Sequence, residues 1–154
     1  MVAIKPKTLV DMRMRGVGES HSRTRIIVRD VAAVVDEPVA RGGTNQGPTP
    51  TETLMSALIS CTNVIASRIA EKKGVAFHDL QIDAHALFDR RGAGLEAEIE
   101  VPFPEITLSI SVRTNATPEQ MTEIQAELGK FCPIAKVIRA SGSRITEVWT
   151  ARPA

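Results

Sequence analysis

The stretch TPTETLMSALISCTN, residues 49–63, decides the fold because it opens a long and unusually apolar helix. Thr49 is followed three residues later by Glu52, the spacing of a capping box in which each side chain satisfies a backbone N–H of the other residue. Pro50 between them suits the first helical position, where no N–H is needed. The pattern predicts that a helix begins at Pro50.

The predicted helix ends near Gly74. Lys72 and Lys73 lie where the helix dipole favours cations, and Gly74 can take the left-handed conformation that ends a helix. Apolar residues cover most of the circumference, so we expect the helix to be buried on several sides and Cys61 to lie inside. They are Leu54, Met55, Ala57, Leu58, Ile59, Cys61, Val64, Ile65, Ala66 and Ile69.

Length and composition indicate a single domain over residues 1–154, because a chain of this size buries about two-thirds of the surface of its unfolded state. The 19 basic and 18 acidic residues nearly cancel and are scattered along the chain. Tyr is absent and Trp149 is the one Trp, which leaves no aromatic surface for stacked bases. We therefore expect neither nucleic acid nor a membrane surface as a partner, but small uncharged substrates or proteins.

The N-terminal residues predict a cytoplasmic location. Residues 1–7 lack the apolar stretch and small-residue cleavage site of a signal peptide. Residues 54–70 are apolar but include Ser, Thr, Asn and Arg, which indicates a core helix rather than a membrane span. In a reducing compartment, we expect each of the two cysteines to be a small core residue or a reactive thiol instead of half of a permanent disulfide.

Before the helix, the pattern predicts three strands. Alternation from Leu9 to Arg15 predicts the first, and residues 16–20 have the composition of a turn. The β-branched run 24–28 and residues 31–35 predict the second and third strands. Residues 41–48 are rich in turn formers and lead to the Thr49 cap.

After the helix, alternation predicts strands over 80–88, 96–101 and 106–112, with a turn at 90–94 and a break or edge at the two prolines, Pro102 and Pro104.

The chain then predicts two helices and a last strand. Residues 117–120 repeat the capping pattern and open a helix that ends or bends at Gly129. Pro133 suits the first position of a new short helix, with Cys132 as its N-cap. Residues 144–150 predict a final strand. The order predicts an α+β fold in which mostly antiparallel sheets pack on the helices.

The two cysteines have different contexts. Cys61 is either a small buried hydrophobe or a reactive thiol, and since burial raises a thiol pKa, reactivity requires a cationic partner from outside its helix. Cys132 looks the more reactive by itself, because a helix N-terminus stabilises a thiolate, although it also fits a simple cap. Although they lie 71 positions apart, the two thiols could meet in space as a redox pair.

Histidines offer no competing chemistry. His21, His78 and His85 have no metal-ligand spacing with either cysteine, so we expect no metal site. His85 alternates onto the strand face opposite the apolar residues, which disfavours a cysteine hydrolase.

Three segments together resemble one known family. They are GGTNQGPTPTETL at 42–54, SCT at 60–62 and FCPIAK at 131–136. These motifs resemble the OsmC/Ohr family of bacterial hydroperoxide-detoxifying proteins, and the likeness runs over the whole chain. The resemblance implies an intertwined homodimer with two long central helices wrapped by sheets, and an active site at each dimer interface.

The resemblance also implies roles for the thiols. Cys61 would attack a peroxide oxygen and become a sulfenic acid, and Cys132 would resolve it as a disulfide. An external dithiol, such as a lipoyl group, would restore both thiols, and no bound cofactor is implied.

By the same resemblance, an arginine from the N-terminal hairpin and a glutamate before the helix assist the thiolate. Arg15 is the best positional match, with Arg13, Arg23 and Arg25 as alternatives, and a solvated strand charge is the simpler interpretation of Arg15.

Glu52 matches the glutamate. The capping box already explains it, and nine helical steps set it on the face opposite Cys61. The form GPTPTE is more similar to the generic OsmC-like branch of the family.

We therefore expect a thiol-dependent peroxidase that acts in oxidative stress defence. Apolar surroundings of Cys61 favour organic hydroperoxides, because a dry site accommodates alkyl groups. The alternative is a stress-linked binding or structural protein that keeps the fold and thiols without useful turnover.

Overall fold

The computed structural model describes residues 8–154, and its contacts divide the chain into an N-terminal unit that ends at Thr53 and a C-terminal unit that begins at Leu54. Residues 1–7, on which the prediction of a cytoplasmic location rested, lie outside the described residues. The single domain over 1–154 stays a prediction.

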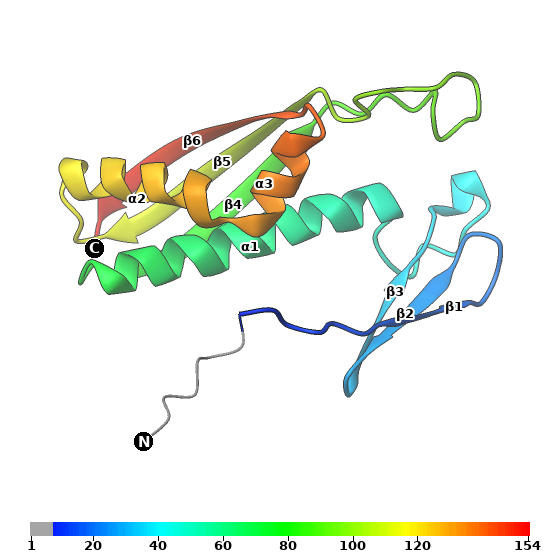
Figure 1. The fold of residues 1–154 in the computed structure, drawn as a ribbon, viewed down its shortest axis with the longest axis horizontal. Coiled ribbons are helices and arrows are strands. Elements are labelled where there is room, and N and C mark those ends of the chain that lie inside the picture. The colour runs from blue at the N-terminus through cyan, green and yellow to red at the C-terminus, as the bar shows by residue number, and fades with distance from the viewer. Residues whose placement is uncertain (1–7) are drawn as a thin grey trace. The chain divides into compact units, whose positions relative to one another are not determined.

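The N-terminal unit contains a three-stranded antiparallel sheet in the order β1-β2-β3 (Figure 1). The strands are β1 (Arg15–Gly18), β2 (Thr24–Val28) and β3 (Val31–Val35), followed by a 3-10 turn, η1 (Val39–Arg41). The second and third strands are confirmed at their predicted bounds.

The predicted strand over Leu9 to Arg15 is wrong, because β1 begins only at Arg15, and the hairpin turn predicted at 16–20 lies at 19–23, where the Glu19 N–H donates to the Arg23 carbonyl (2.8 Å). Pairing starts with Arg15 opposite Ile27 and runs to Gly18 opposite Thr24. β2 is only five residues long, and the chain turns at Arg29, which has a φ of 54°. Only Val28 of β2 remains beyond this pairing, so a strand that starts at Leu9 would have nothing to pair with over most of its length, despite its alternation.

A buried carboxylate fixes the loop that leads into the long helix. Asp36 is fully buried and accepts hydrogen bonds from the backbone N–H groups of Glu37 (2.8 Å), Thr44 (3.1 Å) and Gln46 (3.1 Å) and from the Thr44 hydroxyl (2.6 Å). These donors, the Thr44 hydroxyl first, lower the pKa of Asp36 to about 2. Only glycine fits at Gly43, where a Cβ would lie 1.8 Å from the Glu37 carbonyl oxygen.

The long helix α1 (Pro50–Lys72) has the predicted caps. The Thr49 N–H donates to Oε2 of Glu52 (2.8 Å), and the Glu52 N–H donates to Oγ1 of Thr49 (3.2 Å). Gly74 has a φ of 69°, and the Val75 N–H donates to the Ala70 carbonyl, as in a Schellman motif.

Burial along α1 differs from the prediction. Its buried residues form one face: Leu58, Thr62, Ala66, Ile69 and Ala70. Val64, on another face, is 42% exposed, so burial on several sides is not found within one chain. By length and composition α1 could also cross a membrane, a weak indication because core helices meet the same criterion.

The C-terminal unit packs helices on one face of a second three-stranded sheet (Figure 1). Its elements are β4 (Phe77–Ala86), β5 (Glu105–Thr114), α2 (Pro118–Phe131), α3 (Pro133–Ala140) and β6 (Arg144–Pro153). β5 lies in the middle, antiparallel to β4 and parallel to β6. The α+β class with mostly antiparallel sheets is confirmed.

Two further predictions fail in this unit. Residues 96–101 form no strand, because the 87–104 connection folds on itself through turns such as the hydrogen bond from the Gly94 N–H to the Arg90 carbonyl. Helix α2 continues through Gly129 to Phe131. It ends there because Pro133 forces Cys132 into an extended conformation (φ −69°, ψ 107°).

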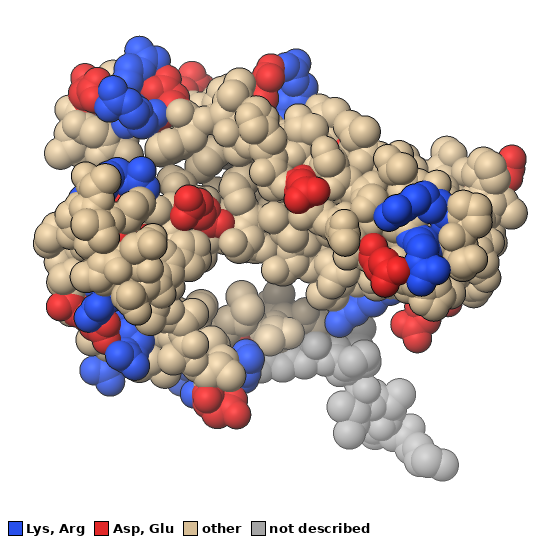
Figure 2. Space-filling view, turned by 180° about the vertical axis from the view of Figure 1, so that it is seen from behind, with Lys and Arg blue, Asp and Glu red and all other residues tan. Residues whose placement is uncertain are grey.

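Charges of both signs are mixed on the surface that Figure 2 shows, where acidic and basic side chains lie next to one another. This agrees with ion pairs such as Arg91–Asp89 and Arg144–Glu105.

Asp36 gives the fold a predicted acid dependence. Since its folded pKa of about 2 is below the ordinary 3.8, its ionised form stabilises the fold above about pH 4, and this contribution is lost as the pH falls towards 2. Asp36→Asn should lower the urea midpoint at pH 6 and flatten its fall between pH 4 and 2, measured by circular dichroism. Asp83→Asn, on an exposed strand position, is the control. An unchanged acid slope in Asp36→Asn would contradict this assignment.

Candidate functional site

The two cysteines meet in the C-terminal unit, although they are 71 positions apart in the sequence. Both are free thiols, and they lie close enough that Cys61 is one of the groups that raise the pKa of Cys132. Cys132 belongs to the buried core and is 0% exposed, whereas Cys61 is half-buried and packs against that core. The structure therefore forms a dithiol with one sheltered and one more accessible sulfur.

Local sequence fixes each cysteine in its place. Cys61 follows Leu58 by three residues and precedes Thr62, so it borders the buried face of α1. Cys132 joins two helices: its N–H donates to the Leu128 carbonyl of α2 (3.0 Å), and its carbonyl accepts from the Lys136 N–H of α3 (3.1 Å). The sulfur of Cys132 is thus oriented by both helices.

Burial dominates the acidity of Cys132. Desolvation is the largest influence and raises the pKa of the Cys132 thiol, and the hydrogen bond and charge of Cys61 raise it further. The N–H groups of Ala135 and Ile134 at the start of α3 act in the opposite direction, although neither makes a full capping hydrogen bond. At Cys132 desolvation therefore outweighs the helix N-terminus, and the expectation that Cys132 is by itself the more reactive thiol stays a prediction. The raised pKa favours the protonated form of Cys132.

Of the four predicted site residues, the two cysteines lie together in the C-terminal unit. Arg15 and Glu52 belong to the N-terminal unit. Arg15 is exposed on β1. The three alternative arginines have carboxylate partners: Arg13 with Asp11 (2.9 Å), and Arg23 (2.9 Å) and Arg25 (2.7 Å) with Glu19. Within residues 8–154, Arg15 has no ion pair, so its guanidinium is the available one of the four.

Glu52 is an ionised cap. Its hydrogen bonds with Thr49, that with the backbone first, and the charge of Arg41 lower the pKa of the Glu52 carboxyl. The capping role predicted for Glu52 is thereby confirmed.

Sequence reasoning missed one ion pair that involves α3, the helix whose N-cap is Cys132. Arg139 of α3 contacts Glu147 of β6 at 3.3 Å. Glu147 sits between Ile145 and Trp149 in the predicted strand, and a charge at an inward position was the available signal.

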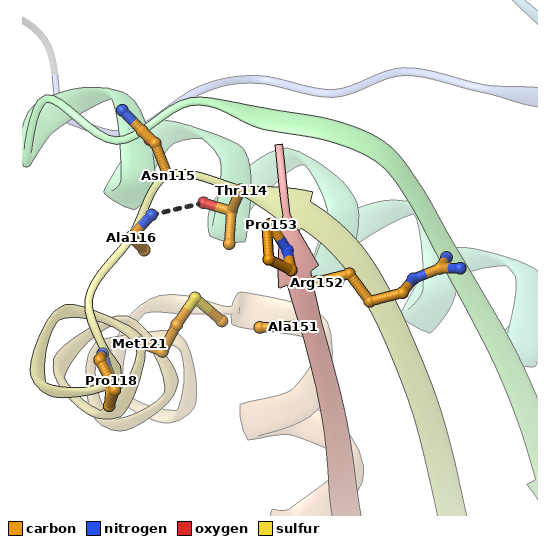
Figure 3. A pocket seen from close by; sticks show the side chains of 8 residues that line it. All are labelled: Thr114, Asn115, Ala116, Pro118, Met121, Ala151, Arg152 and Pro153. Carbon is orange, nitrogen blue, oxygen red and sulfur yellow. Dashed lines mark hydrogen bonds between the residues drawn. The ribbon is translucent and has the colours of Figure 1, made fainter.

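Two further features bear on whether a metal or another ligand could bind: clusters of metal-ligating side chains, and the cavity at α2. Among residues 8–154, no group of three or more His, Cys, Asp or Glu side chains could hold a metal ion. A cavity of about 500 Å³ opens at the start of α2, with Met121 pointing into it and the Arg152 guanidinium directed away (Figure 3). Cys132 follows the opposite end of this 14-residue helix, about 20 Å along the axis, so the cavity is separate from the dithiol.

Solved structures share this fold at low sequence identity. The OsmC-like protein from Mycoplasma pneumoniae is 18% identical with a TM-score of 0.76, over 92% of this chain and 97% of that one. An organic hydroperoxide resistance protein OsmC from Legionella pneumophila is 14% identical with a TM-score of 0.65, over 94% and 98%. OhrB of Bacillus subtilis, an organic hydroperoxide resistance protein, is 15% identical with a TM-score of 0.59, over 93% and 98%.

The family assignment rests on the sequence as well as the fold. A search of curated proteins finds no match. The model of the OsmC-like protein family matches residues 43–147, a range that includes both cysteines and the capping box. Because this match covers more than half of the chain, the chain belongs to the OsmC-like protein family.

Proposed function

We propose that this protein is a thiol-dependent peroxidase that reduces organic hydroperoxides, with Cys61 as the nucleophile and Cys132 as the resolving thiol. The observation that carries the proposal is the pair of free thiols that lie close together in the C-terminal unit. It is supported by family membership and by the likeness to solved structures that are named organic hydroperoxide resistance proteins.

The first step uses the asymmetry of the two thiols. The more accessible Cys61, as thiolate, attacks one oxygen of the hydroperoxide, so that an S–O bond forms while the O–O bond breaks. Sulfur is oxidised to a sulfenic acid, and the leaving alkoxide takes a proton and departs as the alcohol. The Cys132 thiol, which retains its proton because of burial, is a suitable donor.

The second step closes the disulfide. The Cys132 sulfur attacks the Cys61 sulfenic sulfur, so that the S–S bond forms while the S–O bond breaks, and the leaving hydroxide takes from solvent the proton that Cys61 lost on ionisation and becomes water. The sum converts one hydroperoxide and two thiols into alcohol, water and a disulfide. An external dithiol of the lipoyl type then reduces the disulfide by two exchange reactions, and the reducing cytoplasm is the proposed compartment.

An organic substrate suits the apolar surroundings. Cys61 packs against a core made of aliphatic side chains, including Leu58 and Leu128. A dry environment of this kind favours an alkyl hydroperoxide over the strongly hydrated hydrogen peroxide.

We further propose a homodimer as the functional form. The buried residues of α1 form one face in a single chain, while Val64 on the opposite face is 42% exposed, and Leu54, which precedes Leu58 by one turn, is 39% exposed. A second copy that packs along α1 would remove this apolar surface from water.

Cumene hydroperoxide tests the peroxidase function. The reduced wild-type protein with excess dithiol should consume the peroxide catalytically, and without dithiol it should consume one equivalent and lose two hydrogens in its intact mass. Cys61→Ser should abolish both. Cys132→Ser should still react once with peroxide and retain a sulfenic acid that dimedone traps.

The binding-protein alternative predicts the opposite result. If wild-type protein leaves the peroxide unconsumed and both thiols remain titratable, the peroxidase proposal is wrong. Ser141→Ala, which alters a residue in the turn after α3, is a control that should turn over normally.

Arg15 is proposed to stabilise the Cys61 thiolate and the charge that develops on the peroxide. Arg15→Ala should lower kcat/KM for cumene hydroperoxide by about 100-fold, the usual effect of removing one charge-stabilising donor from an active site. Arg13→Ala is the matched control, two residues away and paired with Asp11. Equal activity of Arg15→Ala and wild type would eliminate Arg15 from the site.

Glu52 is proposed to assist catalysis in addition to capping α1. The two roles can be separated, because Gln120 closes the same capping box at α2 through its side-chain oxygen (2.9 Å to the Thr117 N–H). Glu52→Gln should therefore keep the thermal midpoint but lower kcat/KM about tenfold or more, the loss expected for one charge-assisted hydrogen bond. Unchanged kcat/KM would leave Glu52 with the cap as its sole role.

A further inference from the structure

Strand β6 carries a carboxylate on its inward face. Ile145 and Trp149 pack against the core from this face, and Glu147 lies between them with its side chain only 14% exposed. A carboxylate with so little access to water requires charged or hydrogen-bonding partners.

Glu147 has one partner on each of its oxygens. Nη2 of Arg139 donates to Oε1 (3.3 Å), and Nε1 of Trp149 donates to Oε2 (3.4 Å). Arg139 lies in the last turn of α3, so the contact joins that helix to β6. The Trp149 ring is itself held against Phe77, with ring centroids 6.4 Å apart.

This contact is a directional tie between α3 and the sheet. α3 has only eight residues, too few to be stable without tertiary contacts. Its buried residues, Ala135 and Ile138, contribute apolar contacts that have no directional preference. The directional tie from Arg139 to Glu147 restricts rotation and sliding of the helix.

The orientation of α3 is transmitted to Cys132. Cys132 is the N-cap of α3, and its carbonyl accepts the first hydrogen bond of that helix, from the Lys136 N–H. A shift of α3 therefore moves the Cys132 sulfur relative to Cys61 on α1. The largest influences on the pKa of Cys132 are burial, Cys61 and two backbone amides, and Arg139 is not among them.

We propose that Arg139, Glu147 and Trp149 are positioning residues that hold the Cys132 sulfur against Cys61 for disulfide formation. The inference rests on the proposed dithiol function, but its test requires no peroxide. The measured quantity is the effective concentration of one thiol at the other, from the equilibrium with glutathione.

The equilibrium uses balanced thiol–disulfide exchange. The protein dithiol reduces one oxidised glutathione, forming the Cys61–Cys132 disulfide and two reduced glutathione molecules, through a mixed disulfide. Glu147→Gln keeps the size and can still accept a hydrogen bond from Trp149, but it removes the charge that holds Arg139. We expect the effective concentration to fall about tenfold, since small displacements of reacting groups have large effects.

Two further variants make the test specific. Arg139→Met keeps an aliphatic chain at a position about one-third exposed and should reproduce the fall, and the double variant should fall no further, because both changes break one contact. Arg113→Met is the matched control, because it breaks the exposed Arg113–Asp79 pair (2.6 Å) between β5 and β4.

The outcomes separate the two proposals. Wild-type effective concentrations in both Glu147→Gln and Arg139→Met, or an equal fall in Arg113→Met, would overturn the positioning role. A fall limited to the first two variants supports it, even if wild-type protein consumes no peroxide, a result that would defeat the proposed function alone.

Discussion

The inward face of β5 is the surface on which the C-terminal unit depends. Ile106, Leu108, Ile110 and Val112 are all buried to 1% exposure or less, and each contributes about 1.5–3 kcal/mol of hydrophobic stabilisation. All three helices contribute residues to the core on this face. Because α1 and the α2–α3 junction share one apolar surface, cysteines 71 positions apart come into contact.

The same packing determines the difference between the two thiols. A helix N-terminus ordinarily favours a thiolate, yet Cys132 is sealed into the core, and removal of water outweighs the amides of Ile134 and Ala135. Cys61 borders the core and remains partly accessible. One sulfur therefore keeps its proton while its neighbour stays within reach of a substrate, an asymmetry that suits successive roles in disulfide formation.

Signals within a few residues predicted the structure well, and signals that depend on a distant partner did not. Thr49 with Glu52, and Thr117 with Gln120, form their capping boxes because every atom involved lies within one helical turn. Alternation over Leu9 to Arg15 failed, since a strand also needs a free edge, and β2 is too short to provide one.

The candidate site shows the same difference between local signals and signals that depend on distant residues. The N-cap position of Cys132 could be predicted from Pro133, but its pKa depends on burial by residues far away in the sequence.

Glu147 shows where a violated pattern is informative. Strand β6 has an otherwise apolar inward row in which Ile145 and Trp149 flank a carboxylate, and nothing about strand formation or core packing favours a charge there. An ion pair of which one member is about one-third exposed adds little to stability, and even a fully buried pair can often be replaced by apolar residues at no loss, so stability alone is a weak reason for the pair. Geometry is a stronger one: an apolar contact tolerates small slips of α3, whereas a two-donor carboxylate defines one orientation of the helix that begins at Cys132. Departures from local sequence rules are expected where orientation matters more than stability, and here that place is the support of the resolving thiol.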